Sequence, residues 1–337
     1  MSCNKEEYSG VWILAEQSGG RIEPISYELL TRGIDLAAKR GARLSAMVFG
    51  GKLDSDELQT LISRGADRVV AVEDERLEYF TAQPYSQAMI DVIDAYRPEI
   101  ILAGATSTGR TLMPYAAIRV NTGLTADCTI LDIEEGTGNL LQTRPAIGGN
   151  ILATIKTPDH RPQMATIRPH STPQAPIQAG RTGQVVRHKL SRPLNEGAII
   201  KTGFTPNAES ISIADAEKVV VVGRGIKKGE NIPLIYELAD ALGAAVGATR
   251  DVVDRGWLSY PHQVGLSGQT INPRLYVGVG VSGSIQHLAG MQTAGRIIAI
   301  NTDPNADIFK VADMGIVGNL FDVVPAIIAQ LKNGGSL

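Results

Sequence analysis

The residues best placed for chemistry form a Ser-Gly-Ser turn at positions 282–284, directly after the apolar run 275–281. The run predicts a buried parallel strand. The residues after the turn predict a helix, whose first backbone N–H groups and positive dipole end would face an anion. Gln286 and His287 fall in the first turn of that helix, from which they could reach a ring beyond the phosphates. The pattern therefore predicts a phosphate-binding turn at the end of a strand.

Four further predicted strands in the second half of the chain also end in glycine or polar residues. These ends lie at 223–224, 249–250, 301–303 and 318–319. In a doubly wound parallel sheet the carboxyl ends of the strands meet at one edge, so the five ends should line a single ligand site. Their coincidence is a stronger signal than any one motif.

The elements that must position these residues alternate between strand-like and helix-like segments in both halves of the chain. In the first half the predicted strands are 11–15, 43–49, 68–72 and 99–103, and the predicted helices are 27–40, 56–64 and 86–96. In the second half the strands are 218–225, 245–249, 275–281, 296–300 and 314–317, and the helices are 232–242 and 323–331. We therefore expect two doubly wound α/β domains, residues 1–205 and 206–337.

Between the two alternating regions the pattern changes. The strand-like pieces 128–133, 150–155 and 161–169 are expected to be antiparallel additions that close the first domain. Residues 172–209 are rich in Pro, Gly, Thr and Gln and have no helical periodicity, which predicts an extended arm and linker.

Composition excludes several classes of protein. The net charge of −3 argues against nucleic acid as the main partner, because such proteins usually carry a basic surface. The chain has two cysteines, Cys3 and Cys128, which support neither a disulfide framework nor a cysteine metal site. The histidines lack metal-ligand spacing, and a hydrolase elbow and a Walker loop are absent from the sequence. The start of the chain lacks a secretory signal, and no apolar run reaches the length of a membrane span. We expect a cytoplasmic protein without a metal.

Several ordered motifs in the second half resemble the FAD domain of the electron-transfer flavoprotein α subunit. They are residues 223–225, 245–250, 263–268, 275–291, 299–304 and 308–317. Residues 103–106, 109–110 and 122–127 extend the resemblance to the first half. It implies one FAD in a Rossmann-like C-terminal domain, and a nucleotide-hydrolase-like N-terminal domain whose arm contacts a β subunit in a heterodimer. Such a protein carries electrons between a flavin dehydrogenase and an acceptor. It has no catalytic residues, because the cofactor does the chemistry.

The resemblance also implies a role for individual residues. Arg224 would contact the FAD phosphates, and Arg250 would lie against the flavin, where its charge favours the anionic reduced ring. Ser267 would hydrogen-bond flavin N5, and His287 would offer a donor or an imidazolium to the pyrimidine end of the ring. Without the resemblance, each of these is more simply a surface cation, a turn residue or a structural histidine. The complete implied set is Arg224, Thr249, Arg250, Val264, Gly265, Leu266, Ser267, Ser282, Gly283, Ser284, Ile285, Gln286, His287, Asn301, Asp303, Asn319 and Leu320.

Two positions depart from the family pattern. Leu266 stands where many members have glutamine, which removes a polar contact and keeps the backbone contact. Asn319 stands where an aspartate is common near the adenine, and its amide oxygen could still accept from the adenine amino group.

Residues 122–127 and 144–150 look closer to the bacterial group that includes electron-bifurcating members. That likeness implies coupling to NADH and ferredoxin through the β subunit. Two other functions remain open: a stand-alone NAD-dependent oxidoreductase, and a non-catalytic nucleotide-binding protein. The first is disfavoured because no strand ends in Gly-x-Gly-x-x-Gly with an acidic residue at the expected distance.

Overall fold

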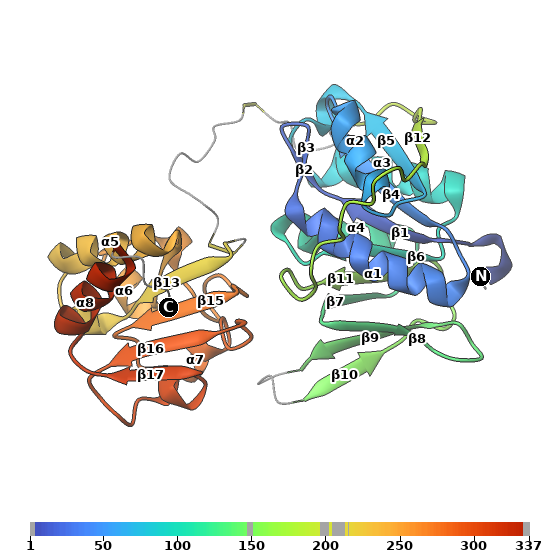
Figure 1. Cartoon of the computed structure of the whole chain (residues 1–337). Coiled ribbons are helices and arrows are strands. Elements are labelled where there is room, and N and C mark those ends of the chain that lie inside the picture. Colours follow the sequence, from blue (N-terminus) through green and yellow to red (C-terminus); the bar gives the residue numbers. More distant parts are fainter. Residues whose placement is uncertain (1–3, 147–150, 196–201, 204–212, 215, 333–337) are drawn as a thin grey trace. The chain divides into compact units, whose positions relative to one another are not determined.

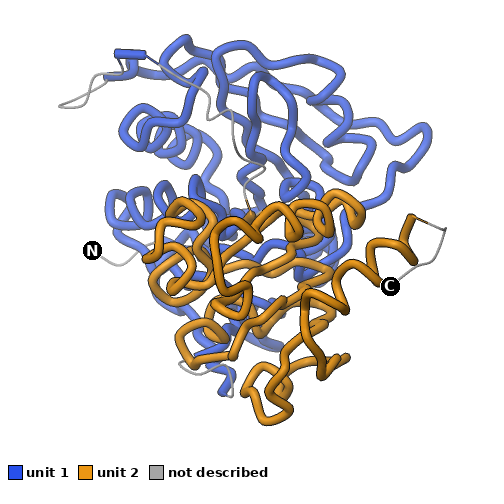
Figure 2. The backbone as a smooth tube through the Cα atoms, turned by 90° about the vertical axis from the view of Figure 1, so that its left-hand side faces the viewer, with its two compact units in different colours: residues 1–205 blue, residues 206–337 orange. Residues whose placement is uncertain are grey.

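The computed structural model describes residues 4–146, 151–195, 202–203, 213–214 and 216–332. The chain divides into two compact units, residues 1–205 and 206–337, which are coloured separately in Figure 2. Each unit has its own parallel sheet covered by helices, so the prediction of two α/β units is confirmed.

The first unit is built on a seven-stranded sheet in the order β12-β5-β4-β1-β6-β11-β7, with every neighbouring pair parallel. Its strands are β1 (Val11–Ala15), β4 (Leu44–Gly50), β5 (Arg68–Glu73), β6 (Ile100–Gly104), β7 (Leu124–Cys128), β11 (Gln163–Ile167) and β12 (Gln184–Arg187). The chain leaves β1 towards β4 on one side and returns to β6 on the other. This reversal makes the end of β1 the switch point of the sheet.

Helices cover both faces of this sheet (Figure 1). Helices α1 (Pro24–Arg40) and α2 (Ser55–Ser63) pack on one face, in a core that includes Leu29 and Leu61. Helices α3 (Ala82–Tyr96) and α4 (Ser107–Arg119) pack on the other, in a core that includes Met89 and Met113. A small antiparallel hairpin, β2 (Gln17–Ser18) and β3 (Arg21–Ile22), follows β1.

The prediction of antiparallel additions is right for the segments 128–133 and 150–155 and wrong for 161–169. Strands β8 (Ile130–Ile133), β9 (Leu140–Pro145) and β10 (Leu152–Ile155) form a three-stranded antiparallel sheet. Strand β11 instead lies parallel between β6 and β7, with all five of its residues buried. Polar residues in β11 make this central strand look like an edge strand in the sequence. Gln163 is nevertheless buried, and its side-chain oxygen accepts from the backbone N–H of Leu140.

The predicted arm is held along its own unit. It supplies β12, whose register with β5 runs from Gln184 opposite Arg68. Beyond β12, Asp91 on α3 accepts from the backbone N–H of Ser191 and contacts His188 at 2.8 Å. This part of the predicted arm, up to residue 195, is therefore a structural strap, and most of residues 196–209 lie outside the described residues.

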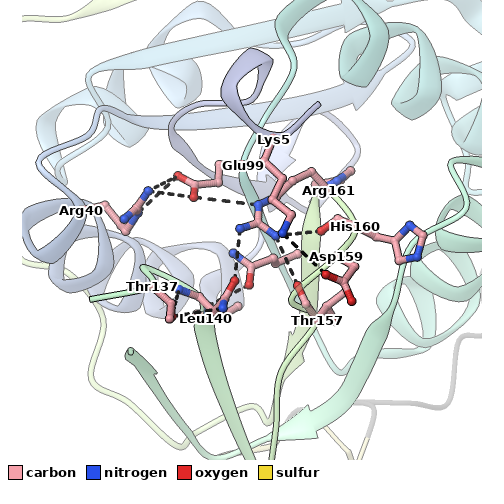
Figure 3. Close-up of polar contacts among 12 residues, drawn as sticks. Lys5, Arg40, Glu99, Thr137, Leu140, Thr157, Asp159, His160 and Arg161 are labelled. Carbon is pink, nitrogen blue, oxygen red and sulfur yellow. Dashed lines mark hydrogen bonds and ion pairs between the residues drawn. The ribbon is translucent and has the colours of Figure 1, made fainter. Parts of the chain in front are cut away.

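A buried ion pair joins separate parts of the first unit at the amino end of β6 (Figure 3). Glu99 is 8% exposed and accepts two bonds from Arg40 Nη2, at 2.8 and 3.1 Å. Arg161, on the loop before β11, has its Nε 4.0 Å from Oε1 of Glu99 and donates to the side-chain oxygen of Asn139 at 3.2 Å. The pair thus ties α1, β6, the β8–β9 turn and β11 together.

Replacing Glu28 with glutamine is expected to stabilise the protein at alkaline pH. Burial raises the pKa of Glu28 to about 7, although its carboxylate accepts from the backbone N–H of His170 at 2.8 Å. The pKa of Glu28 is higher in the folded protein than in the unfolded chain. Its contribution to the free energy of unfolding is therefore fully present below about pH 4.5 and is lost as the pH rises through 7.

Glutamine keeps the hydrogen bond without this loss. We therefore expect the difference in free energy of unfolding between Glu28→Gln and the wild type to grow, in favour of the variant, by on the order of 2–3 kcal/mol from pH 5 to pH 8. Thermal unfolding at the two pH values measures the gain, and Asp35→Asn on the exposed face of the same helix is the control. Parallel pH profiles for wild type and Glu28→Gln would contradict the prediction.

The second unit has a five-stranded parallel sheet in the order β14-β13-β15-β16-β17. In chain order this is 2-1-3-4-5, a common doubly wound arrangement. The strands are β13 (Lys218–Val222), β14 (Ala245–Ala248), β15 (Leu275–Val279), β16 (Ile297–Asn301) and β17 (Met314–Val317). Helices α5 (Ile232–Leu242) and α8 (Leu320–Lys332) pack on one face, while α6 (Arg250–Asp254) and α7 (Ile285–Leu288) follow strand ends.

Candidate cofactor-binding site

A cavity of about 890 Å³ lies at the carboxyl ends of β13, β14, β15 and β16 in the second unit. The chain reverses direction across the sheet between β13 and β15, and this switch point is where doubly wound sheets bind ligands. The backbones of the two following loops touch there, with Gly225 N–H donating to Gly280 O at 3.1 Å. A Cβ at Gly223 would lie 2.2 Å from the same oxygen. Glycine is therefore needed for the loops to meet and form the floor of the cavity.

The Ser-Gly-Ser turn forms one wall and is joined to the loop after β16. Ser282 O accepts from Ile308 N–H at 3.1 Å, and Gly283 has a φ of +85°. Asn301 donates from its side chain to Val281 O at 2.8 Å, so its amide holds the two loops together. The helix predicted after the turn is present as α7, which has four residues and is followed by a turn in which Gly290 N–H donates to His287 O at 3.0 Å. Backbone N–H groups can contact an anion here, with little help from a helix dipole.

Two arginines provide the positive charge of the cavity. Arg224 lies 3.5 Å from Asp251, and Arg250 lies 3.3 Å from Asp254. The four side chains are between 44% and 74% exposed, so these pairs contribute only about 0–1 kcal/mol and are readily exchanged for a bound phosphate or an anionic ring. Both arginines follow strand ends and line the cavity.

The turn at residues 264–268 forms the opposite wall. Ser267 Oγ accepts from the Gln263 side chain at 3.0 Å, which leaves the hydroxyl proton free to donate to a ligand. Leu266 N–H donates to Gln286 O at 2.8 Å, so this backbone donor is used within the protein, and the residue is 74% exposed. Gly265, with a φ of +140°, packs directly against α7.

His287 lines the cavity but is not the donor or imidazolium that we expected. Its Nε2 lies 2.8 Å from the Tyr276 hydroxyl, and its Nδ1 lies 3.1 Å from Val264 O. Burial lowers the pKa of His287 to about 4, so the ring is neutral at physiological pH. Both nitrogens are engaged inside the protein, and the positive charge near a bound ring must come from the arginines.

Most predicted site residues line this one cavity. These are Arg224, Thr249, Arg250, Val264, Gly265, Leu266, Ser267, Ser282, Gly283, Ser284, Gln286, His287, Asn301 and Asp303. Three are not in its lining. The Ile285 side chain is exposed, Leu320 is buried in the helical core, and Asn319 uses its side-chain oxygen to accept from Phe321 N–H at 3.3 Å near the start of α8.

Several lining residues were missed. Asp251 and Asp254 follow the Thr-Arg pair on α6, and Asn305, Ala306 and Asp307 follow Asp303. The sequence predicts only the strand end at 301–303 as part of the site, but the loop after β16 continues to line the cavity up to Asp307. The length of this loop was the signal in the sequence that could have identified these residues.

The switch point of the first unit offers much less space. The cavity beside the end of β1 measures about 30 Å³, enough for one water molecule. Glu16 accepts there from Thr106 Oγ1 at 2.7 Å, and the Gln17 side chain donates to Phe49 O at 3.1 Å. The chain's own side chains thus fill a crevice that corresponds to the large cavity of the second unit.

The donor set and size of the large cavity fit a flavin dinucleotide. Its volume falls within the range of ligand sites, glycine backbone and two arginines suit the pyrophosphate, and Ser267 offers a hydroxyl to a ring. Among the described residues there is no cluster of three or more side chains that could hold a metal. None of the described helices combines the length and apolar character needed to cross a bilayer.

Comparison with known proteins covers both units. The family described as "Electron transfer flavoprotein domain" matches residues 11–193, and "Electron transfer flavoprotein FAD-binding domain" matches residues 212–292. The electron transfer flavoprotein subunit alpha of Thermoanaerobacterium thermosaccharolyticum is 45% identical, covering 97% of this chain and 98% of the relative. That of Clostridium acetobutylicum is 42% identical, covering 98% of both chains. The subunit LctC of the Acetobacterium woodii lactate dehydrogenase (NAD(+),ferredoxin) is 37% identical, covering 98% of this chain and 79% of the relative.

Proposed function

The chain belongs to the electron transfer flavoprotein family as an α subunit with an FAD-binding domain, and from this premise we propose that it carries electrons through one FAD held in the cavity of its second unit. Bound FAD supplies the redox chemistry, since it accepts and releases electrons. The protein binds the cofactor, orients it and sets the charge around it. Supporting this assignment, one cavity gathers glycine loops, Arg224, Arg250 and Ser267.

The partners follow from the family and from the relatives. Electron transfer flavoprotein α subunits pair with a β subunit, and we propose the same heterodimer for this chain. We further propose that it takes electrons from or gives them to a flavin dehydrogenase in the cytoplasm. The Acetobacterium relative, whose name includes NAD(+) and ferredoxin, favours a bifurcating system in which the β subunit adds NADH and ferredoxin.

The test is to produce the chain with and without its β subunit. We expect flavin absorption bands that survive desalting of the heterodimer, with one FAD assigned to this chain, and NADH-dependent reduction of ferredoxin when a dehydrogenase acceptor is present. A colourless heterodimer that binds NADH would overturn the assignment of FAD. Retained flavin without ferredoxin reduction would overturn the bifurcating role alone.

A further inference from the structure

A buried tyrosine stands directly behind His287. Tyr276, the second residue of β15, is 0% exposed, and its hydroxyl lies 2.8 Å from His287 Nε2. The tyrosine ring can lie along the strand because residue 278 is glycine. A Cβ at Gly278 would come within 2.9 Å of the ring carbon Cε1 of Tyr276. The strand is thus shaped so that this ring reaches α7.

The partners of His287 determine where its protons lie. Val264 O can only accept, so Nδ1, at 3.1 Å from it, carries the proton. In the neutral ring Nε2 is then an acceptor, and the Tyr276 hydroxyl donates to it. Every polar atom of this small network is satisfied, as buried groups require. His287 therefore has one hydrogen bond to the turn that begins at Val264 and one to the sheet.

This network joins two walls of the cavity. The turn at residues 264–267 carries Ser267, and its Leu266 N–H also bonds to Gln286 O on α7. Helix α7 directly follows the Ser-Gly-Ser turn of the opposite wall. A Cβ at Gly290 would lie 2.5 Å from the Cα of Gly265, so the two segments are already in backbone contact. The imidazole is the side-chain link between these walls.

We propose that Tyr276 is a positioning residue of the cofactor site, which acts through a neutral His287 to hold the 264–267 turn at a constant distance from α7. This inference rests on the proposed assignment of the cavity to FAD. In this arrangement the imidazole of His287 fixes the position of the 264–267 turn, and Arg250 supplies the positive charge beside the flavin ring.

The first test is Tyr276→Phe in the FAD-loaded heterodimer, followed by ¹⁵N NMR of labelled histidine. In the wild type, His287 should stay neutral with its proton on Nδ1 between pH 6 and pH 8. In Tyr276→Phe, the Nε2 signal should move to that of an acceptor without a partner, and FAD should dissociate roughly tenfold faster. Tyr85→Phe removes a buried hydroxyl in the first unit, bonded to Leu77 O at 2.8 Å, and should leave FAD dissociation unchanged.

A second set of variants separates positioning from general loss of packing. His287→Asn keeps a donor near the position of Nδ1 and should retain FAD better than His287→Ala. Tyr276→Phe combined with His287→Ala should be no worse than His287→Ala alone, because the tyrosine acts through the histidine. An imidazolium signal in the wild type, or additive losses in the double variant, would overturn the proposal. The histidine signals can also be recorded without flavin, so this outcome is independent of whether FAD binds.

Discussion

Gly283→Ala is expected to lower the affinity for FAD by about two orders of magnitude, which corresponds to roughly 2.7 kcal/mol. The φ of +85° at Gly283 strains any L side chain, and a Cβ there would lie 2.2 Å from the backbone nitrogen of Ile308. The loop after β16 would have to move, although it carries Asp303 and Asp307 of the cavity lining. Titration of the flavin-free heterodimer with FAD measures the loss.

Gly256→Ala is the matched control for this prediction. Gly256 also has a positive φ, of +70°, but a Cβ there would meet nothing within 4 Å. It lies outside the cavity lining. This variant has the backbone strain without the displaced loop, so it should bind FAD within about threefold of the wild type. Equal losses in the two variants would show that strain, and not the position of the loop, controls binding.

Glu99→Ala should destabilise the first unit by about 3–5 kcal/mol, because it removes the buried carboxylate that faces Arg40 and Arg161. Arg161 is 6% exposed, and it also donates to neutral oxygens such as His160 O at 2.9 Å. Arg40 would lose both of its short contacts with the carboxylate. Amide hydrogen exchange along β6 and β11 in the full chain measures the opening free energy.

The control for this prediction is Asp35→Ala, which removes an exposed partner of Lys39 at 2.9 Å on α1. A surface pair of this kind contributes at most about 1 kcal/mol. Similar exchange rates in Glu99→Ala and Asp35→Ala would mean that the buried pair contributes no more than a surface contact.

The strand positions were predictable because buried parallel strands are nearly continuous apolar runs. Residues 218–222 and 275–279 appear in the sequence as apolar segments followed by glycine, and both are strands whose following glycines line the cavity. The direction of β11 was not predictable in the same way. Its pairing with β6 and β7 depends on segments far apart in the chain, and local pattern carries no information about them. Helix α1 likewise starts at Pro24, ahead of the predicted start at Tyr27, because proline suits the first turn of a helix.

The candidate site shows the same division. Glycines and arginines at strand ends could be assigned to the cavity from the sequence, because the doubly wound sheet brings those ends together. The state of His287 could not, since it depends on Tyr276, a residue that appears in the sequence only as part of an apolar strand. Asn319 and Leu320 follow a strand end too, but the first turn of α8 takes their side chains elsewhere.

The strap that supplies β12 also has a consequence for synthesis. Strand β5 is paired with β4 early in the chain, but its other edge is covered only by residues 184–187. Until the ribosome has released the chain to about that point, the nascent first unit presents an open strand edge, which is a template for pairing with other chains. Aggregation through this edge of β5 should therefore fall once the strap, which ends near the buried Leu194, has been synthesised.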